Sequence, residues 1–402
     1  MNRRDFLHSA AAVALAARYA AAAEEQGRTA QADAFIKGKD ARLIVHNDEV
    51  GELETPLELL REHAQTPKEV LFVRNNQILP GVLTTAPAEP GDWSLELAGL
   101  LDKPQSVALT DLARLPQEKV ELVLQCSGNG RALFSRAAKT SGAQWQRGAM
   151  GNVVFQGVPL RVLLRHAGAS PLDGARYLTA EGADTPGMEG AADFEHSLPL
   201  ADALSRSIVA LRMNGEPLPR VHGGPLRLVT PGFYGTMHVK WLTRLRFEES
   251  ESTNHHHVGR YRTPLTRLSP GDKFSSTLEN SEPNWQMRIK SVIFAPLDGD
   301  LLAAGRTTIR GVAWNDGTAR IDGVEVSVDG GQTWRQAQLR RPDSPYAWHP
   351  WSIEADLPAG QQTILARATD ALGRTQPLDG SIHWNPAGYT WNGVERIEVT
   401  VG

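Results

Sequence analysis

Alternating apolar and polar residues mark two strands in the first two thirds of the chain. In VELVLQC, residues 120–126, and in HVKWLTRLRF, residues 238–247, mostly apolar side chains recur at every second position. This period of two is typical of a strand with one buried face, so the pattern predicts strands over both segments. His238 and Lys240 fall on the opposite face of the second strand, where both side chains can converge on one ligand.

Two short helices are predicted between these strands. Pro159–His166 and Pro199–Ser205 each begin with a proline, which suits the first turn of a helix because that position needs no backbone N–H donor. Strand patterns lie before, between and after them. The mixture predicts a mixed α/β first domain, which we place over residues 24–284.

A second domain, of the all-β class, is predicted over residues 285–402. After Ser275–Asn284 the chain shifts to β-type segments that recur about every ten residues, as in a β-sandwich. The turn Asp329-Gly330-Gly331 predicts a hairpin, because glycine adopts the positive φ that such a turn requires. The segments are Thr308–Trp314, Val324–Val328, Thr333–Leu339 and Thr363–Thr369. The fold class is therefore predicted to be α+β, with a mixed α/β domain followed by an all-β sandwich.

The composition is that of a globular protein without a nucleic-acid partner. The 402 residues are 41% hydrophobic and 22% charged, with 42 Lys and Arg against 46 Asp and Glu. These proportions are ordinary for globular domains. The formal net charge of −4 provides no polycationic surface for phosphate backbones, so neither DNA nor RNA is expected to bind.

The first 23 residues are predicted to be a signal peptide. MNRRDFLHSAAAVALAARYAAAAEE has a basic start, an alanine-rich stretch and small residues near Ala21–Ala23, where cleavage is expected. Arg3-Arg4 resembles the twin-arginine export signal, a route for proteins already folded around a cofactor. The apolar run is too short for a membrane span, and Arg18 interrupts it. We therefore expect a periplasmic mature protein without a membrane span and with a net charge of −6.

Cys126 is the only cysteine, so it cannot form an intramolecular disulfide in an oxidising compartment. One interpretation is a buried structural thiol that behaves as a small hydrophobic side chain. The other is a functional thiolate. Cys126 ends the predicted strand 120–126, and Ser127-Gly128-Asn129-Gly130-Arg131 follows, where glycines allow the backbone to approach a ligand closely.

Common catalytic motifs do not explain this cysteine. The chain has no P-loop, HExxH, CxxC or GxSxG motif, which removes the best indication for those enzyme classes. His255-His256-His257 has no cysteine nearby, and adjacent histidines rarely converge on one metal ion. A zinc site is therefore not expected at the three histidines.

Six short segments, considered in order, carry a family signature. They are Phe72–Asn75, Leu124–Arg131, Trp145 with Gly148–Asn152, Gly157–Arg161, His222–Arg227 and His238–Leu242. Together they resemble the sulfite oxidase family of molybdenum enzymes. The resemblance implies a molybdopterin domain followed by an immunoglobulin-like dimerisation domain, and hence a homodimer. Because the chain has no CxxCH haem motif, it also implies a separate c-type cytochrome as the electron acceptor.

The resemblance assigns roles to individual residues. Cys126 matches the cysteine whose thiolate binds molybdenum, a soft ligand that suits such a metal. The positions that match pterin and phosphate ligands are Asn75, Asp184, His222, Arg227, His238 and Lys240. The positions that match the substrate pocket are Arg74, Arg131, Trp145 and Tyr261. The arginines are expected to attract a small sulfur oxyanion, and Tyr261 to donate a hydrogen bond or relay protons.

The implied reaction is the oxidation of sulfite to sulfate by oxygen-atom transfer, with two one-electron steps to the cytochrome. Two departures from the family bear on the substrate. The late segment reads Trp384-Asn385-Pro386-Ala387 where relatives carry an arginine, and Asn76 stands where many relatives have histidine. The alternatives are a sulfane dehydrogenase subunit of a thiosulfate-oxidising system, a reductase that uses the same centre, and a cofactor-free binding protein on this scaffold.

Overall fold

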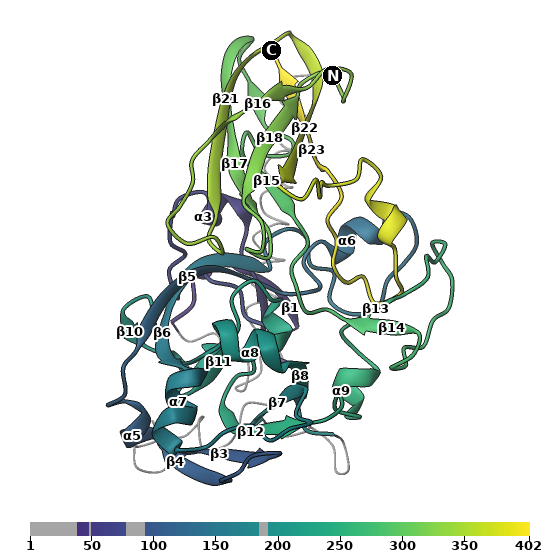
Figure 1. Ribbon diagram of the computed structural model, residues 1–402. Coiled ribbons are helices and arrows are strands. Elements are labelled where there is room, and N and C mark those ends of the chain that lie inside the picture. The colour runs from purple at the N-terminus through teal and green to yellow at the C-terminus, as the bar shows by residue number, and fades with distance from the viewer. Residues whose placement is uncertain (1–37, 48–49, 78–92, 185–191) are drawn as a thin grey trace.

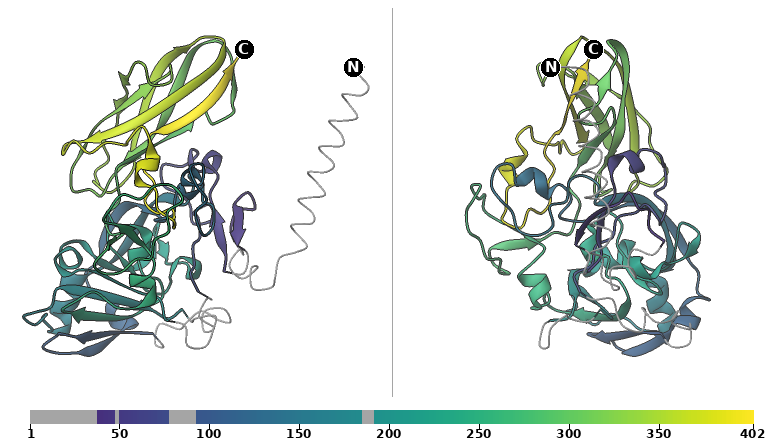
Figure 2. Two further views of the ribbon diagram at one scale, coloured as in Figure 1. Left: turned by 90° about the vertical axis from the view of Figure 1, so that its right-hand side faces the viewer. Right: turned by 180° about the vertical axis from the view of Figure 1, so that it is seen from behind.

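The computed structural model describes residues 38–47, 50–77, 93–184 and 192–402. The predicted signal peptide, residues 1–23, lies outside the described residues. Figures 1 and 2 show a mixed domain below and an elongated β domain above it. In the described parts of the chain, no helix has the length and apolar character needed to cross a membrane.

The first sheet of the lower domain positions Cys126. Its strand order is β10-β9-β6-β5, with β11 also paired to β9, and all of its pairs are antiparallel. The strands are β5 (Glu118–Gln125), β6 (Met150–Pro159), β9 (Ile208–Met213), β10 (Glu216–Pro217) and β11 (Arg227–Val229). The predicted strand over 120–126 is confirmed, and Cys126 is the first residue after β5.

The second sheet has the order β4-β3-β12-β7-β8, with β3 parallel to β12 and the other pairs antiparallel. Its strands are β3 (Ser94–Gly99), β4 (Gln105–Ala108), β7 (Tyr177–Gly182), β8 (Glu195–Pro199) and β12 (Leu242–Glu248). Both predicted helices are confirmed as α7 (Leu160–Ala167) and α8 (Leu200–Arg206), each with a proline at its N-cap. Helix α5 (Leu109–Leu112) follows β4.

The predicted strand over 238–247 is wrong in its first half. A 3-10 turn, η3 (Gly235–Met237), precedes His238, and β12 begins only at Leu242. Trp241 has a φ of 49°, which breaks the extended chain, and its N–H donates to Gly223 O at 3.1 Å. Alternation in the sequence did not reveal this break because Trp241 is apolar and buried, as a strand residue would be.

The upper domain consists of two sheets, with the orders β15-β17-β21-β20 and β16-β23-β22-β18-β19. The first contains β15 (Lys290–Ala295), β17 (Gly305–Trp314), β20 (Gln338–Leu339) and β21 (His349–Leu357). The second contains β16 (Leu301–Leu302), β18 (Ile321–Ser327), β19 (Arg335–Gln336), β22 (Gly360–Asp370) and β23 (Glu395–Val401). Side chains from both sheets form one apolar core. The hairpin turn has positive φ at Gly330 and Gly331, as predicted; the immunoglobulin-like topology stays a prediction.

The remaining short elements lie outside the four sheets described above. They are β1 (Ile44–Asn47), β2 (Glu52–Glu54), α3 (Leu57–Leu60), α6 (Arg131–Phe134), η2 (Arg220–His222), α9 (His255–Val258), β13 (Arg262–Pro264), β14 (Ser281–Pro283) and η4 (Gly380–His383). After η4, residues 384–391 of the upper domain run beside α6, which Figure 1 shows in yellow against blue. Trp391 packs edge-on against Phe134 of α6, and Ser141 N–H donates to Pro386 O at 2.8 Å.

Candidate active site

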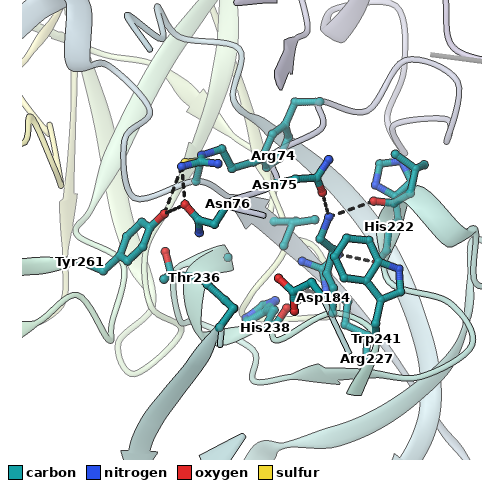
Figure 3. Close-up of a pocket in the computed structure, with 17 residues that line it drawn as sticks. Arg74, Asn75, Asn76, Asp184, His222, Arg227, Thr236, His238, Trp241 and Tyr261 are labelled. Atoms are coloured by element: carbon teal, nitrogen blue, oxygen red, sulfur yellow. Dashed lines mark hydrogen bonds between the residues drawn. The ribbon is translucent and has the colours of Figure 1, made fainter. Parts of the chain in front are cut away.

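Nine of the eleven predicted site residues line one pocket, which Figure 3 shows. They are Arg74, Asn75, Cys126, Asp184, His222, Arg227, His238, Lys240 and Tyr261. They come from the 72–77 segment, the end of β5, the loop after β7, η2, β11 and the turn before β12, and the residue before β13. The pocket therefore collects residues that are far apart in the sequence.

Cys126 lies in the wall of this pocket at the start of a tight glycine loop. Its thiol accepts a hydrogen bond from Gly128 N–H at 3.4 Å, and its own N–H donates to Ala149 O at 2.9 Å. Burial raises the pKa of the Cys126 thiol, although the charges of Arg74 and Arg131 oppose this effect. A cation at the sulfur would stabilise the thiolate further.

Basic side chains dominate one end of the pocket. Arg227 donates to His238 O at 3.0 Å and to His222 O at 2.9 Å, so its guanidinium is held by carbonyls. Burial lowers the pKa of Arg227 to about 9. Burial and the nearby Arg227 charge also lower the pKa of Lys240 well below its usual value. The neighbouring positive charges are thus poorly compensated within the protein.

A single carboxylate, that of Asp184, faces these cations among the described residues that line the pocket. Burial raises the pKa of Asp184 to about 7, against the charge of Lys240. Oδ1 of Asp184 and Nδ1 of His238 are both buried and find no hydrogen-bond partner among the described residues. Lys240 donates to Asn75 Oδ1 and, at 3.1 Å, to Val221 O, and its ammonium lies 4.2 Å from the ring centroid of Trp241.

The other end of the pocket joins Arg74, Asn76 and Tyr261. Asn76 Oδ1 accepts hydrogen bonds of 2.6 Å from both Arg74 and the Tyr261 hydroxyl. Arg74 also forms an ion pair of 2.9 Å with Glu52. Burial acts to lower the pKa of Arg74, but Tyr261, Glu52 and Cys126 outweigh it and hold that pKa above its usual value. Arg74 is therefore a permanent cation that already has one carboxylate partner.

Arg131 and Trp145, the other two predicted substrate residues, do not line this pocket. Arg131 lies beside an adjoining cavity of about 710 Å³, which also touches Arg74 and Tyr261. Its guanidinium donates to Ala387 O and to Ala143 O, both at 2.8 Å. Trp145 is fully buried behind the pocket wall, where its ring contacts His46 and Phe72.

Sequence reasoning missed three side chains around the site: Lys39, Glu52 and Tyr389. Tyr389 comes from the upper domain and stacks on Tyr261 with ring centroids 5.2 Å apart. Lys39 Nζ lies 3.1 Å from Nε2 of His222, a residue 183 positions away. No periodic pattern or motif marks these three residues in the sequence, because each acts through a long-range contact.

The three consecutive histidines lie in α9 beside the pocket, and His256 and His257 are buried. His257 Nε2 lies 2.9 Å from a carboxylate oxygen of Glu251, and His257 Nδ1 lies 3.2 Å from Nδ1 of His196. Within the described ranges, no group of three or more His, Cys, Asp or Glu side chains is arranged to hold a metal ion. Of the three, His257 thus contacts Glu251 and His196, and the ring of His196 lies 5.4 Å from that of Tyr261.

Two protein families match most of the chain. Residues 83–256 match the family described as oxidoreductase molybdopterin binding domain, and residues 281–402 match the Mo-co oxidoreductase dimerisation domain. These two ranges correspond to the lower and upper domains.

Curated relatives and a solved structure agree with these matches. The chain is 34% identical to mitochondrial sulfite oxidase of Mus musculus, over 87% of this chain and 64% of that protein. It is 32% identical to sulfite oxidase of Gallus gallus, over 86% of this chain and 75% of that protein. The sulfane dehydrogenase SoxCD of Paracoccus pantotrophus aligns with a TM-score of 0.72 and 29% identity, covering 86% of this chain and 83% of that chain.

Proposed function

Because the chain belongs to the sulfite oxidase family, we propose that it is a periplasmic sulfite dehydrogenase that oxidises sulfite to sulfate and passes electrons to a c-type cytochrome. The observation that carries the proposal is the position of Cys126. Its thiol lies in a pocket with a cluster of buried cations at one end and Arg74 with Tyr261 at the other. The first end suits an anionic cofactor and the second a small oxyanion.

The donor set of the pocket fits the cofactor of this family, molybdenum bound to molybdopterin, which carries a phosphate. Arg227 and Lys240 place two buried basic groups against the single carboxylate of Asp184, and the ring of His222 lies beside them. Burying cations without anions is costly, so a bound phosphate with charge-assisted hydrogen bonds would relieve the imbalance. The unpartnered Oδ1 of Asp184 and Nδ1 of His238 are suited to polar groups of the pterin.

Each end of the pocket has its own task in this proposal. The bound molybdenum supplies oxygen-atom transfer and accepts two electrons. Cys126 would be its protein ligand, since a soft thiolate suits the metal. Arg74 would hold the sulfur oxyanion with those N–H groups that Glu52 and Asn76 leave free. The Tyr261 hydroxyl, already bonded to Asn76, would donate to the same oxyanion or exchange a proton with solvent.

Anaerobic reduction of the purified holoenzyme tests the proposed substrate. Sulfite should reduce the enzyme, and electron paramagnetic resonance should then detect Mo(V) after one electron is returned to an oxidant. Steady-state turnover with sulfite should reduce cytochrome c. A holoenzyme that contains molybdenum but is not reduced by sulfite would refute sulfite oxidation.

A sulfane dehydrogenase role is the second candidate. The structural likeness to SoxCD favours it, as does the 710 Å³ cavity outside the pocket, where Pro386 and Ala387 occupy the segment that carries an arginine in other relatives. Assays with free sulfite and with a carrier protein bearing a persulfide distinguish the two. Preference for the carrier by kcat/KM would favour the second candidate.

The periplasmic location and the homodimer are further parts of the proposal, and each has its own test. The twin-arginine pattern supports a periplasmic location, which cell fractionation tests. The matched dimerisation domain supports a homodimer, which light scattering tests. Metal analysis of protein expressed with molybdate tests the remaining alternative, because a stable chain without molybdenum would indicate a cofactor-free binding protein.

A further inference from the structure

A partly buried lysine, Lys39, lies beside His222 at the cation-rich end of the pocket. Lys39 precedes β1, and its segment is fixed by Asp40 N–H, which donates to Glu69 O at 3.0 Å. The ammonium of Lys39 donates to Leu71 O at 2.6 Å and to Lys68 O. It has no carboxylate hydrogen-bond partner among the described residues. Nothing about the immediate sequence of Lys39 suggests a role at the pocket.

The hydrogen-bond geometry of Lys39 determines the state of His222. Burial lowers the pKa of Lys39 to about 7, so below that pH the side chain is an ammonium. An ammonium has three N–H donors and no acceptor. Two donors of Lys39 reach carbonyl oxygens, and the third faces Nε2 of His222 at 3.1 Å. Nε2 must then be the acceptor. Because burial and the nearby charge of Lys39 lower the pKa of His222, the ring is neutral and carries its one proton on Nδ1.

The proton on Nδ1 matters because His222 lines the pocket. The ring is buried, and its two hydrogen-bond contacts with described residues, Lys39 Nζ and Lys68 O, are both at Nε2. Arg227 fixes the backbone of His222 through a bond of 2.9 Å to its carbonyl oxygen. We infer that Lys39 is a positioning residue that fixes His222 as an Nδ1–H donor to the phosphate of the molybdopterin. This inference rests on the proposed cofactor role of His222 and is independent of the substrate.

The structure also indicates what happens without the ammonium. Lys68 O lies 3.4 Å from Nε2 of His222, so it can accept a hydrogen bond from a protonated Nε2. His222 would then change tautomer, and its Nδ1 would present a lone pair to the phosphate instead of a proton. Loss of Lys39 would thereby convert one pocket donor into an acceptor.

The tautomer can be measured by nitrogen NMR of the full-length, cofactor-free chain labelled with 15N-histidine. At pH 6, where Lys39 is charged and His222 is neutral, wild-type His222, assigned by comparison with a His222→Asn variant, should be protonated at Nδ1, and the Lys39→Met variant at Nε2. Lys68→Met is the matched control, because that side chain is exposed and pairs with Glu216 while its carbonyl stays in place. An unchanged tautomer in Lys39→Met would overturn the inference.

A double-mutant cycle on cofactor retention separates positioning from a general effect on folding. Lys39→Met should weaken retention of molybdenum and pterin during dialysis about 10- to 100-fold, the effect of one hydrogen bond to a charged group. Asparagine at position 222 offers an N–H near the Nδ1 position whether or not Lys39 is present. In the His222→Asn background, Lys39→Met should therefore change retention less than about threefold. Equal losses in both backgrounds would show a merely structural lysine.

Neither readout uses turnover, so the outcome does not depend on whether sulfite is the substrate. A chain that holds its cofactor through Lys39 and His222 but fails to oxidise sulfite would refute only the proposed reaction.

Discussion

Replacing Arg262 with methionine should release Tyr261 from a strained backbone conformation. Tyr261 has a φ of 55°, in the left-handed region that costs a residue other than glycine about 1–2 kcal/mol. The next residue, Arg262, is buried and holds the chain in place. It donates to Ser281 Oγ at 2.9 Å, to Ser281 O at 2.7 Å and to Glu251 at 2.7 Å.

The structure indicates that these contacts outweigh the strain. The side chains of Arg262 and Glu251 are 1% and 16% exposed, so their ion pair is largely shielded from water. Removing one partner of a buried pair costs about 3–5 kcal/mol, which exceeds the strain at Tyr261. In Arg262→Met the left-handed conformation should no longer be held, and the Tyr261 hydroxyl should leave Asn76.

Two measurements test this reasoning. The free energy of unfolding in urea should fall by about 3–5 kcal/mol in Arg262→Met. The kcat/KM for sulfite should also fall, and adding Tyr261→Phe should reduce it no further, because the hydroxyl is already misplaced. Arg267→Met is the control, since Arg267 is exposed in the same segment. Effects on kcat/KM that multiply in the double variant would refute a shared cause.

The ion pair between Arg262 and Glu251 also predicts how the stability of the protein changes at acidic pH. Burial acts to raise the pKa of Glu251, but hydrogen bonds from His257 and Arg262 outweigh it and lower that pKa. A carboxyl whose pKa is lower in the folded than in the unfolded protein stabilises the fold at pH values above its unfolded pKa of about 4.3. This stabilisation is lost as the pH falls through the pKa of the folded state. Arg262→Met should therefore lose less stability than the wild type between about pH 5 and pH 3.

Three further substitutions test separate parts of the site. Cys126→Ser should leave the unfolding transition nearly unchanged and abolish sulfite-dependent cytochrome reduction; normal turnover would contradict the proposed metal ligand. Glu52→Gln should lower the KM for sulfite about tenfold, because a nearby unit charge is worth roughly 1–2 kcal/mol, whereas an unchanged KM would argue against Arg74 as the anion site. Gly130→Ala should lower the calorimetric Tm more than Gly174→Ala, although both glycines have a positive φ. An added Cβ at Gly130 would lie 2.6 Å from an indole carbon of Trp391, whereas at Gly174 it would meet nothing within 4 Å. Equal shifts in Tm would contradict the predicted clash.

The sequence predicted the parts of the fold that local patterns control. The strand that ends at Cys126 and the two proline-initiated helices follow from periodicity and from the preference of proline for a first turn. The predicted start of the strand that contains β12 was wrong, because a positive φ at Trp241 does not alter the alternation of apolar and polar residues. Local patterns carry the positions of buried faces, but they do not carry isolated changes of backbone direction.

The candidate site was predictable only where a family motif marks it. Resemblance brought Arg74, Cys126 and Lys240 together in the expected pocket. It did not reveal Lys39 or Tyr389, because their contacts are with partners remote in sequence and depend on how the N-terminal segment and the upper domain close over the lower one. Such closing contacts require the three-dimensional arrangement.

The distribution of charge along the pocket explains how one site can separate cofactor from substrate. At the cofactor end, the cations contact carbonyls and amides and have few carboxylates, so their charge remains available to a phosphate. At the proposed substrate end, Arg74 is paired with the carboxylate of Glu52, and Arg131 lies outside this pocket, beside the adjoining cavity. Net attraction for anions is therefore strong at the first end and weak at the second. Recognition of a small oxyanion must then depend on where the N–H groups of Arg74 and the hydroxyl of Tyr261 point. The choice between free sulfite and carrier-bound sulfur would therefore be set by the geometry of these two side chains.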